Sequence, residues 1–329
     1  MPARKTVEEK LADLDGVTAE KDRAAAAARL TAALADRHYS VVAKAAKLAA
    51  GGLQYDLRAA MAAAYRRLLE KPVKSDPNCI AKKALVRALV ELDYADVAFY
   101  SDGLRYRQME PVWGGSADTA AELRCNCAMG LVAMGYSRAL VDAAELLYDA
   151  EPEARAGAVR AIACGNRREA ELLLRGKVLA GDAEPAVLGE CFDALLAVEP
   201  DESLAFVARY LAHADEALRE LAALALGESR VDGALAVLKA AWDDPLPPAG
   251  LRRALIRAAA MHRSDPAFDW LIEIAASRDA RTAGEVIEAL ALYKQNTKLA
   301  ARLKAALAER GDAALQRQFG DLWEARRGA

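Results

Sequence analysis

Apolar and small residues recur along this chain with the period of an amphipathic helix, and one such stretch is copied many times. The stretch from Asp215 to Gly227 has an acidic start, a single Arg and a run of small apolar residues. Copies of its pattern, apolar-Arg-x-x-small-small-x-Ala-Leu, end at Ala49, Leu89, Leu131, Ile162, Leu195, Leu226, Ala259 and Leu290. Recurrence every 31 to 42 residues predicts stacked repeats rather than one globular core.

Each repeat is predicted to be a pair of helices. A second apolar-periodic segment lies between successive copies, as at 204–211, 235–242 and 268–275. Acidic residues and Pro mark the start of the copied helix, because they suit the free N–H groups of a first turn. With 79 Ala and only 19 aromatic residues, the composition favours close helix packing over sheet, and the predicted class is all-α.

The Arg of the pattern, numbered zero here, is kept in most copies. Position zero holds Lys82, Arg124, Arg155, Arg219 and Arg252, and departs from the pattern at Val42, Leu188 and Ala283. An Asp lies six residues earlier in five copies, at positions 36, 76, 118, 149 and 182.

These Asp, Arg and Ala-Leu positions resemble the HEAT repeat, and the shorter period of the later copies is similar to the HEAT-like repeats of phycobilin-lyase-type proteins. The resemblance covers residues 17–311 and implies an α-solenoid of eight to nine helical hairpins, curved as a right-handed arc without sheet. It also implies an Asp–Arg ladder between neighbouring repeats. Residues 1–16 are expected to be an N-terminal cap or flexible segment. Residues 312–329 are expected to form a capping helix with Phe319 and Trp323 facing inward.

Net charge, apolar runs and cysteine content limit the partners and the cell compartment that we expect for this protein. The net charge of −3 excludes a generally polycationic coat for nucleic acid. No apolar run is long enough to span a bilayer, the first residues do not resemble a secretory signal, and five cysteines form no paired framework. We therefore expect no membrane contact and a cytoplasmic location.

One part of the array is markedly basic. Residues 37–87 hold eleven Lys or Arg and only three acids. In the family fold, positions +1, +2 and +5 of the second helices should line the concave face. The basic candidates on and beside this face are Lys44, Lys47, Lys82, Lys83 and Arg87. They predict a site for phosphate, nucleic acid or an acidic protein segment, and the alternative is a solvated surface.

An insert at 101–116 lengthens the third repeat. It and its flanks are rich in aromatic residues interleaved with Arg, a mixture used by binding hot spots. Its candidate residues are Arg105, Tyr106, Arg107 and Trp113, and the alternative is a loop packed on its own repeat. We expect the basic end and the insert to form one site, open toward Asn126 and Met129.

The sequence carries no recognisable catalytic motif. Cys125 and Cys127 cannot by themselves complete a tetrahedral metal site, and neither a metal nor a cofactor is expected. The carboxylate pairs Glu190/Asp193 and Glu285/Glu288 each lie on one helical face, where such pairs are usually solvated. The predicted function is a non-catalytic scaffold or adaptor that holds a protein partner on the concave face. The alternatives are a DNA glycosylase-like enzyme acting on nucleic acid, and a bilin lyase or chaperone.

Overall fold

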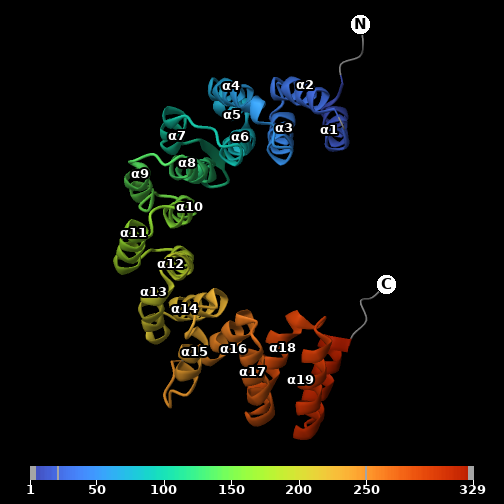
Figure 1. The fold of residues 1–329 in the computed structure, drawn as a ribbon, viewed down its shortest axis with the longest axis vertical. Coiled ribbons are helices and arrows are strands. Elements are labelled where there is room, and N and C mark those ends of the chain that lie inside the picture. The colour runs from blue at the N-terminus through green and yellow to red at the C-terminus, as the bar shows by residue number, and fades with distance from the viewer. Residues whose placement is uncertain (1–4, 21, 249, 325–329) are drawn as a thin grey trace. The chain divides into compact units, whose positions relative to one another are not determined.

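The computed structural model describes residues 5–20, 22–248 and 250–324. The chain divides into two compact units, Met1–Leu173 and Leu174–Ala329, and the division falls inside helix α11. Each unit is built from packed α-helices (Figure 1). The predicted all-α class is confirmed, with one small exception in the first unit.

The first unit contains the following elements: α1 (Val7–Asp15), α2 (Arg23–Leu34), α3 (Tyr39–Gly51), α4 (Arg58–Leu69), α5 (Pro72–Ser75), α6 (Ile80–Glu91), α7 (Val97–Leu104), β1 (Met109–Val112), β2 (Gly115–Asp118), α8 (Ala121–Ala133), α9 (Ala139–Leu146) and α10 (Pro152–Ala163). Short 3₁₀ turns lie at Gly16–Ala19, Tyr55–Leu57 and Pro77–Cys79. Helix α11 (Arg167–Ala180) begins in this unit and ends in the next.

The second unit continues with these elements: α12 (Pro185–Val198), α13 (Pro200–Ala208), α14 (Glu216–Ser229), α15 (Ala234–Trp242), α16 (Leu251–His262), α17 (Asp265–Ser277), α18 (Ala280–Leu290), α19 (Thr297–Arg310) and α20 (Ala313–Phe319). It also has 3₁₀ turns at Arg209–Ala212 and Ala291–Tyr293, and a π turn at Gly320–Glu324.

All eight copies of the sequence pattern are α-helices, namely α3, α6, α8, α10, α12, α14, α16 and α18. Within each unit these second helices pack on one another in order, as α3 on α6, α6 on α8 and α8 on α10, and again from α12 to α18. In the first unit, α2, α4, α7 and α9 form a separate layer on one side of them (Figure 1). The repeat seen in sequence is therefore a packing unit of two helices.

Small residues make the contact between successive second helices close. Ala45, Ala46 and Ala49 of α3 are completely buried. Gly227 of α14 faces the backbone of α16, where a Cβ on Gly227 would lie 2.1 Å from the carbonyl oxygen of Ala258. A larger side chain at such positions would force the helices apart.

The insert at 101–116 contains a β-hairpin, so the expectation of no sheet is wrong. Strands β1 and β2 pair antiparallel, and their register joins Val112 to Gly115 across a two-residue turn. Gly114 in that turn has a φ of +85°, a conformation that glycine adopts without strain. The first residues of the insert instead extend α7 to Leu104. Strands of four residues, one containing Pro111, are too short to show a period of two.

Buried polar contacts fix this hairpin to the start of α6. The Glu110 carboxylate accepts hydrogen bonds from the backbone N–H of Asn78 at 2.7 Å, from Gln108 Nε2 at 2.6 Å and from Thr119 Oγ1 at 2.7 Å. Gln108 Nε2 also donates to the carbonyl of Asp76 at 2.9 Å. Because Gln108 and Glu110 are both buried, the hairpin is a packed part of the unit.

An ion cluster around Arg124 links two neighbouring repeats. Arg124 is fully buried and donates to Asp118 of its own repeat at 2.7 Å and to Asp149 of the next repeat at 2.9 Å. Arg107 contacts the same two carboxylates from the surface, at 3.2 and 2.8 Å. Burial alone would raise the pKa of Asp118 and of Asp149, but hydrogen bonds and the guanidinium charges lower both pKa values overall.

Both chain ends of the described structure are helical. Helix α1 begins with a capping box between Thr6 and Glu9 and packs on α3. Phe319 and Trp323 stack on each other at 5.2 Å and are buried, as predicted for the capping helix. Residues 325–329 of that predicted helix lie outside the described residues.

Replacing Arg124 with Ala should strongly destabilise the first unit. It leaves two buried carboxylates without their buried cation, which typically costs about 3–5 kcal/mol. Arg107→Ala is the matched control, because its side chain is 48% exposed and its loss should cost under about 1 kcal/mol. Urea unfolding would measure both, and equal losses would contradict the cluster as described.

Gly227→Ala should destabilise the second unit, since its new methyl group meets backbone that cannot rotate away. Overpacking of this kind costs about 1–3 kcal/mol. Gly176→Ala is the control, because Gly176 is exposed within α11 and a Cβ there would meet no other part of the described chain within 4 Å beyond its own helix backbone and chain neighbours. That substitution should stabilise by about 0.5–1 kcal/mol. A melting temperature that Gly227→Ala leaves unchanged would show that α14 and α16 can separate without loss.

Candidate functional site

Positions +1, +2 and +5 of the second helices line open grooves between neighbouring helices. The α3–α6 groove, of about 520 Å³, is lined by Lys47, Ala50, Gly51, Ile80, Lys83, Ala84, Arg87, Ala88, Glu91 and Glu122. The α16–α18 groove, of about 420 Å³, is lined by Leu224, Arg253, Ile256, Arg257, Ala260, Met261, Glu285, Glu288, Ala289 and Leu292. The groove linings thus combine the face-lining repeat positions with buried residues such as Ile256 and Ala88.

Three predicted site residues, Lys47, Lys83 and Arg87, meet in the α3–α6 groove. Lys83 Nζ lies 3.2 Å from Glu122, and Arg87 Nε lies 2.9 Å from Glu91. Lys47 makes no ion pair within the described chain. The groove therefore combines cations with carboxylates and is less basic than the sequence window indicated.

Lys82 was wrongly predicted to be a surface binding residue. It stands at position zero, where the side chain turns toward the loop before its own helix and is fully buried. Its Nζ lies 3.1 Å from the buried carboxylate of Asp76 and 3.3 Å from the carbonyl of Pro72. Lys82 thus takes the place that Arg124 has in the next repeat and serves the fold.

Lys44 is also engaged within the unit. Its Nζ donates to the carbonyl of Leu11 at 2.7 Å and pairs with Asp15, both from the α1 region. Spacing within α3 could not reveal this contact, because α1 lies outside the repeat pattern. Lys44 is half-buried as a result.

Two arginines of the basic window cap helix ends, one in the preceding repeat and one in their own repeat. Arg67 donates to the carbonyls of Leu34 and Asp36 at the end of α2, at 2.9 and 3.0 Å. Arg58 donates to the carbonyls of Leu92 and Asp93 at the end of α6, both at 3.3 Å. The last carbonyls of a helix lack intrahelical partners and carry partial negative charge, so guanidinium groups stabilise them. The clustered basic residues of this window therefore stabilise helix ends as well as forming a charged surface.

The residues of the insert do not all lie at the α3–α6 groove. Trp113 is at the hairpin turn and is fully exposed, at 103%. Arg105 and Arg107 line a different depression, beside Asp142, Glu145 and Asp149 on the α9 side. The expected union of the basic residues and the whole insert in one site is therefore wrong for these two arginines, because Asp118 and Asp149 hold Arg107 in the ion cluster.

The other predicted residues near the insert are partly buried. The Tyr106 hydroxyl lies 2.7 Å from Gln108 Oε1, and burial raises the pKa of Tyr106. Asn126 and Met129 on α8 are half-buried. Cys125 is buried against α10, and this burial raises its thiol pKa to about 12, so the reactive thiolate is disfavoured.

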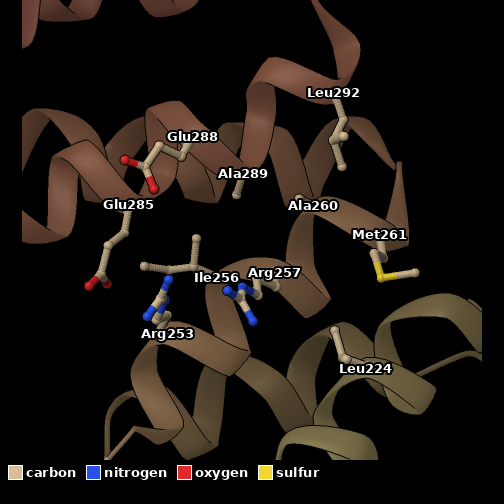
Figure 2. A pocket seen from close by; sticks show the side chains of 10 residues that line it. All are labelled: Leu224, Arg253, Ile256, Arg257, Ala260, Met261, Glu285, Glu288, Ala289 and Leu292. Atoms are coloured by element: carbon tan, nitrogen blue, oxygen red, sulfur yellow. The ribbon is translucent and has the colours of Figure 1, made fainter. Parts of the chain in front are cut away.

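The α16–α18 groove has a charged end and an apolar end (Figure 2). Arg253 and Arg257 come from α16, and Glu285 and Glu288 come from α18, on opposite sides of Ile256 (Figure 2). Leu292, Met261 and Leu224 lie toward the other end. Arg253, Arg257, Glu285 and Glu288 stand at the face-lining positions +1, +5, +2 and +5 of their helices. The sequence did not indicate that they share a groove with Leu292, because that depends on how α16 and α18 pack together.

Another surface of the second unit, around Asp193, is acidic. Asp193 of α12 is exposed, yet partial burial, and then the charges of Glu228 and Glu190, raise its carboxyl pKa to about 6. The crowding of these carboxylates is a consequence of α12 packing on α14, the helix that carries Glu228. Within the described residues, no group of three or more His, Cys, Asp or Glu side chains is arranged to hold a metal ion.

Known proteins offer little guidance. No family model matches the chain, and no curated protein matches it. Among solved structures, the chain is similar to two engineered proteins from the Northeast Structural Genomics Consortium. One is 15% identical, with 99% of this chain and 97% of that chain covered and a TM-score of 0.32. The other is 16% identical, with 90% and 94% covered and a TM-score of 0.15. TM-scores this low do not support a shared fold or a shared function.

Asp193→Asn should stabilise the protein at neutral and higher pH. The folded state holds the Asp193 proton more tightly than the unfolded chain, where the pKa is about 3.8. The folded state therefore binds more protons between pH 3.8 and about 6, and stability falls as the pH rises through that window. The asparagine variant does not lose stability in this way as the pH rises. Its melting temperature should therefore be higher than that of wild type at about pH 8 and equal to it at about pH 4.

The matched control for this prediction is Asp232→Asn, which removes the charge of another exposed aspartate. Melting temperatures measured across the pH range would separate the two. If Asp193→Asn and Asp232→Asn change the melting temperature equally at every pH, the crowding of carboxylates at α12 and α14 does not affect stability.

Proposed function

We propose that this chain is a non-catalytic interaction protein, a HEAT-like α-solenoid whose second helices hold a segment of a partner protein. In this proposal the face that lines the grooves between second helices is the binding face. The observation that carries the proposal is the α3–α6 groove, where Lys47, Lys83 and Arg87 from two successive copies converge. Position zero of the same helices is buried, so the repeat separates packing positions from binding positions.

The charges of the groove favour a protein segment over a nucleic acid. Glu91 and Glu122 sit beside Arg87 and Lys83, and carboxylates repel the phosphates of a nucleic acid. A protein segment can supply carboxylates or phosphorylated side chains for the cations, and cations for Glu91. The bound segment is therefore acidic or phosphate-bearing in part, rather than uniformly anionic.

Trp113 supplies a second contact for the partner. A fully exposed Trp at the turn of a hairpin held by buried hydrogen bonds is a rigid apolar group. Such residues dominate binding energy when a partner covers them.

All five cysteines are free thiols, four of them buried, which supports a reducing compartment such as the cytoplasm. Among the described residues, no helix is long and apolar enough to cross a membrane.

A capture experiment from the native cell tests the proposal. The tagged chain should retain the same protein with and without nuclease treatment. Lys83→Glu combined with Arg87→Glu should slow association roughly tenfold and weaken its salt dependence, because both groove cations are reversed. Trp113→Ala should mainly raise the dissociation rate, by roughly thirtyfold if Trp113 is worth about 2 kcal/mol.

The matched control reverses two cations of the same sequence window that lie outside the groove. Lys71→Glu with Lys74→Glu makes the same change in net charge on exposed residues of the α5 region. Capture abolished by nuclease would favour the glycosylase-like alternative. If the groove and Trp113 variants bind the captured protein as wild type does, with folding intact, the proposed site is wrong.

A further inference from the structure

The two walls of the α16–α18 groove carry opposite charges that do not neutralise each other. Arg257 Nη1 pairs with Glu220 at 2.5 Å, and Glu285 pairs with Arg281 at 3.4 Å. Glu288 accepts a hydrogen bond from Gln318 Nε2 at 3.3 Å. Within the described chain no ion pair joins the arginines of α16 to the glutamates of α18, although both line the same groove (Figure 2).

The floor between these walls is apolar. Ile256 and Ala260 are each only 1% exposed and offer no polar side-chain atom. Leu292, beyond the end of α18, is 78% exposed and lies at the apolar end with Met261 and Leu224. A helix that covers the exposed Leu292 side chain would remove its apolar area from water, which favours binding.

The length of the groove suits two turns of a helix. Arg253 and Met261 are eight residues apart on α16, or about 12 Å at 1.5 Å per residue. Residues at i, i+3, i+4 and i+7 of another helix would span this distance on a single face. An extended peptide would instead bring unpaired backbone N–H and C=O groups onto a floor without hydrogen-bond partners, whereas a helix satisfies its own.

We propose that the α16–α18 groove binds an amphipathic α-helix of a partner protein, whose apolar stripe is flanked by acidic residues toward α16 and basic residues toward α18. The opposite charges of the two walls favour this helix. Charged residues beside the apolar seam of a coiled coil select the partner helix in the same way. The site lies in the second unit and goes beyond the function proposed for the α3–α6 groove.

Three synthetic helices test this assignment. Each is a stapled, fluorescently labelled peptide of two heptads with the same Leu stripe, too short to form a stable coiled coil. One has Glu on one flank and Lys on the other, one has Glu on both flanks, and one has Lys on both. Fluorescence anisotropy should show the mixed peptide binding the full chain roughly tenfold tighter than either uniform peptide, because each uniform peptide faces one repelling wall.

Charge reversal in the groove should switch the preference. Arg253→Glu with Arg257→Glu makes both walls acidic, so the chain should then prefer the peptide with Lys on both flanks. Glu285→Lys with Glu288→Lys should produce the opposite preference. Arg253→Glu alone, which keeps the Arg257–Glu220 pair, should give a smaller shift in the same direction if the double variant folds poorly.

Two controls separate this site from other surfaces. Lys298→Glu reverses an exposed charge on α19 and should leave all three affinities unchanged. Lys83→Glu with Arg87→Glu should also leave them unchanged, so failure at either groove is distinguishable from failure at the other.

Three outcomes would overturn the proposal. The peptides could bind equally, fail to bind, or keep their order of affinity after charge reversal. Binding of phosphatidylcholine vesicles that Leu292→Asp abolishes, with no peptide bound, would instead assign the groove to a zwitterionic lipid.

Discussion

Close approach between successive second helices is the constraint on which the rest of the structure depends. At several contacts the facing residues are Ala or Gly, as at Ala45 and Ala46 in α3 and Gly227 in α14, where almost no space remains for a side chain. Helices α3, α8 and α14 have Ala or Cys at positions +3 and +4, whereas α6, α16 and α18 have Leu, Val or Ile there, and within each unit successive second helices still pack on one another. The high alanine content of the chain is consistent with this close packing of helices.

Close packing brings helix ends of neighbouring repeats together, and charged side chains satisfy the groups left there. Arg67 and Arg58 donate to the terminal carbonyls of α2 and α6, and Arg124 joins the carboxylates of two repeats. Lys82 pairs with the single buried carboxylate of Asp76 in its own repeat. Some basic residues of such a stretch therefore cap helix ends and others remain on the surface. Only the contacts in the folded unit show which residue does which.

What remains for binding is the set of positions that neither packing nor capping uses. In the α3–α6 groove these are Lys47, Lys83 and Arg87, with two carboxylates beside them. In the α16–α18 groove they are two arginines, two glutamates and an apolar end. The repeats share one backbone plan, so differences at these few positions give each groove its own chemistry, and this is how a repeat protein would distinguish partners.

The sequence by itself determined the helices, their pairing and the face each one buries. The period of small and apolar residues sets these locally, and all eight copied segments are helices as predicted. Phe319 and Trp323 were also placed inward correctly. Three of the eleven candidate site residues, Lys47, Lys83 and Arg87, were correctly placed on one surface, because their spacing along α3 and α6 fixes a common face.

Only the tertiary structure decided how the remaining residues are used. The β-hairpin of the insert is held by hydrogen bonds from Asn78 to Glu110 and from Gln108 to Asp76, between residues 32 apart in the sequence, which no local period records. The same is true of Arg107, which Asp149 of the next repeat fixes in the ion cluster, and of Lys82, buried against Asp76. The α16–α18 groove likewise exists only after two helices meet. Long-range hydrogen bonds and ion pairs depend on which segments the fold places side by side, and a repeating pattern specifies the stacking but not these individual partners.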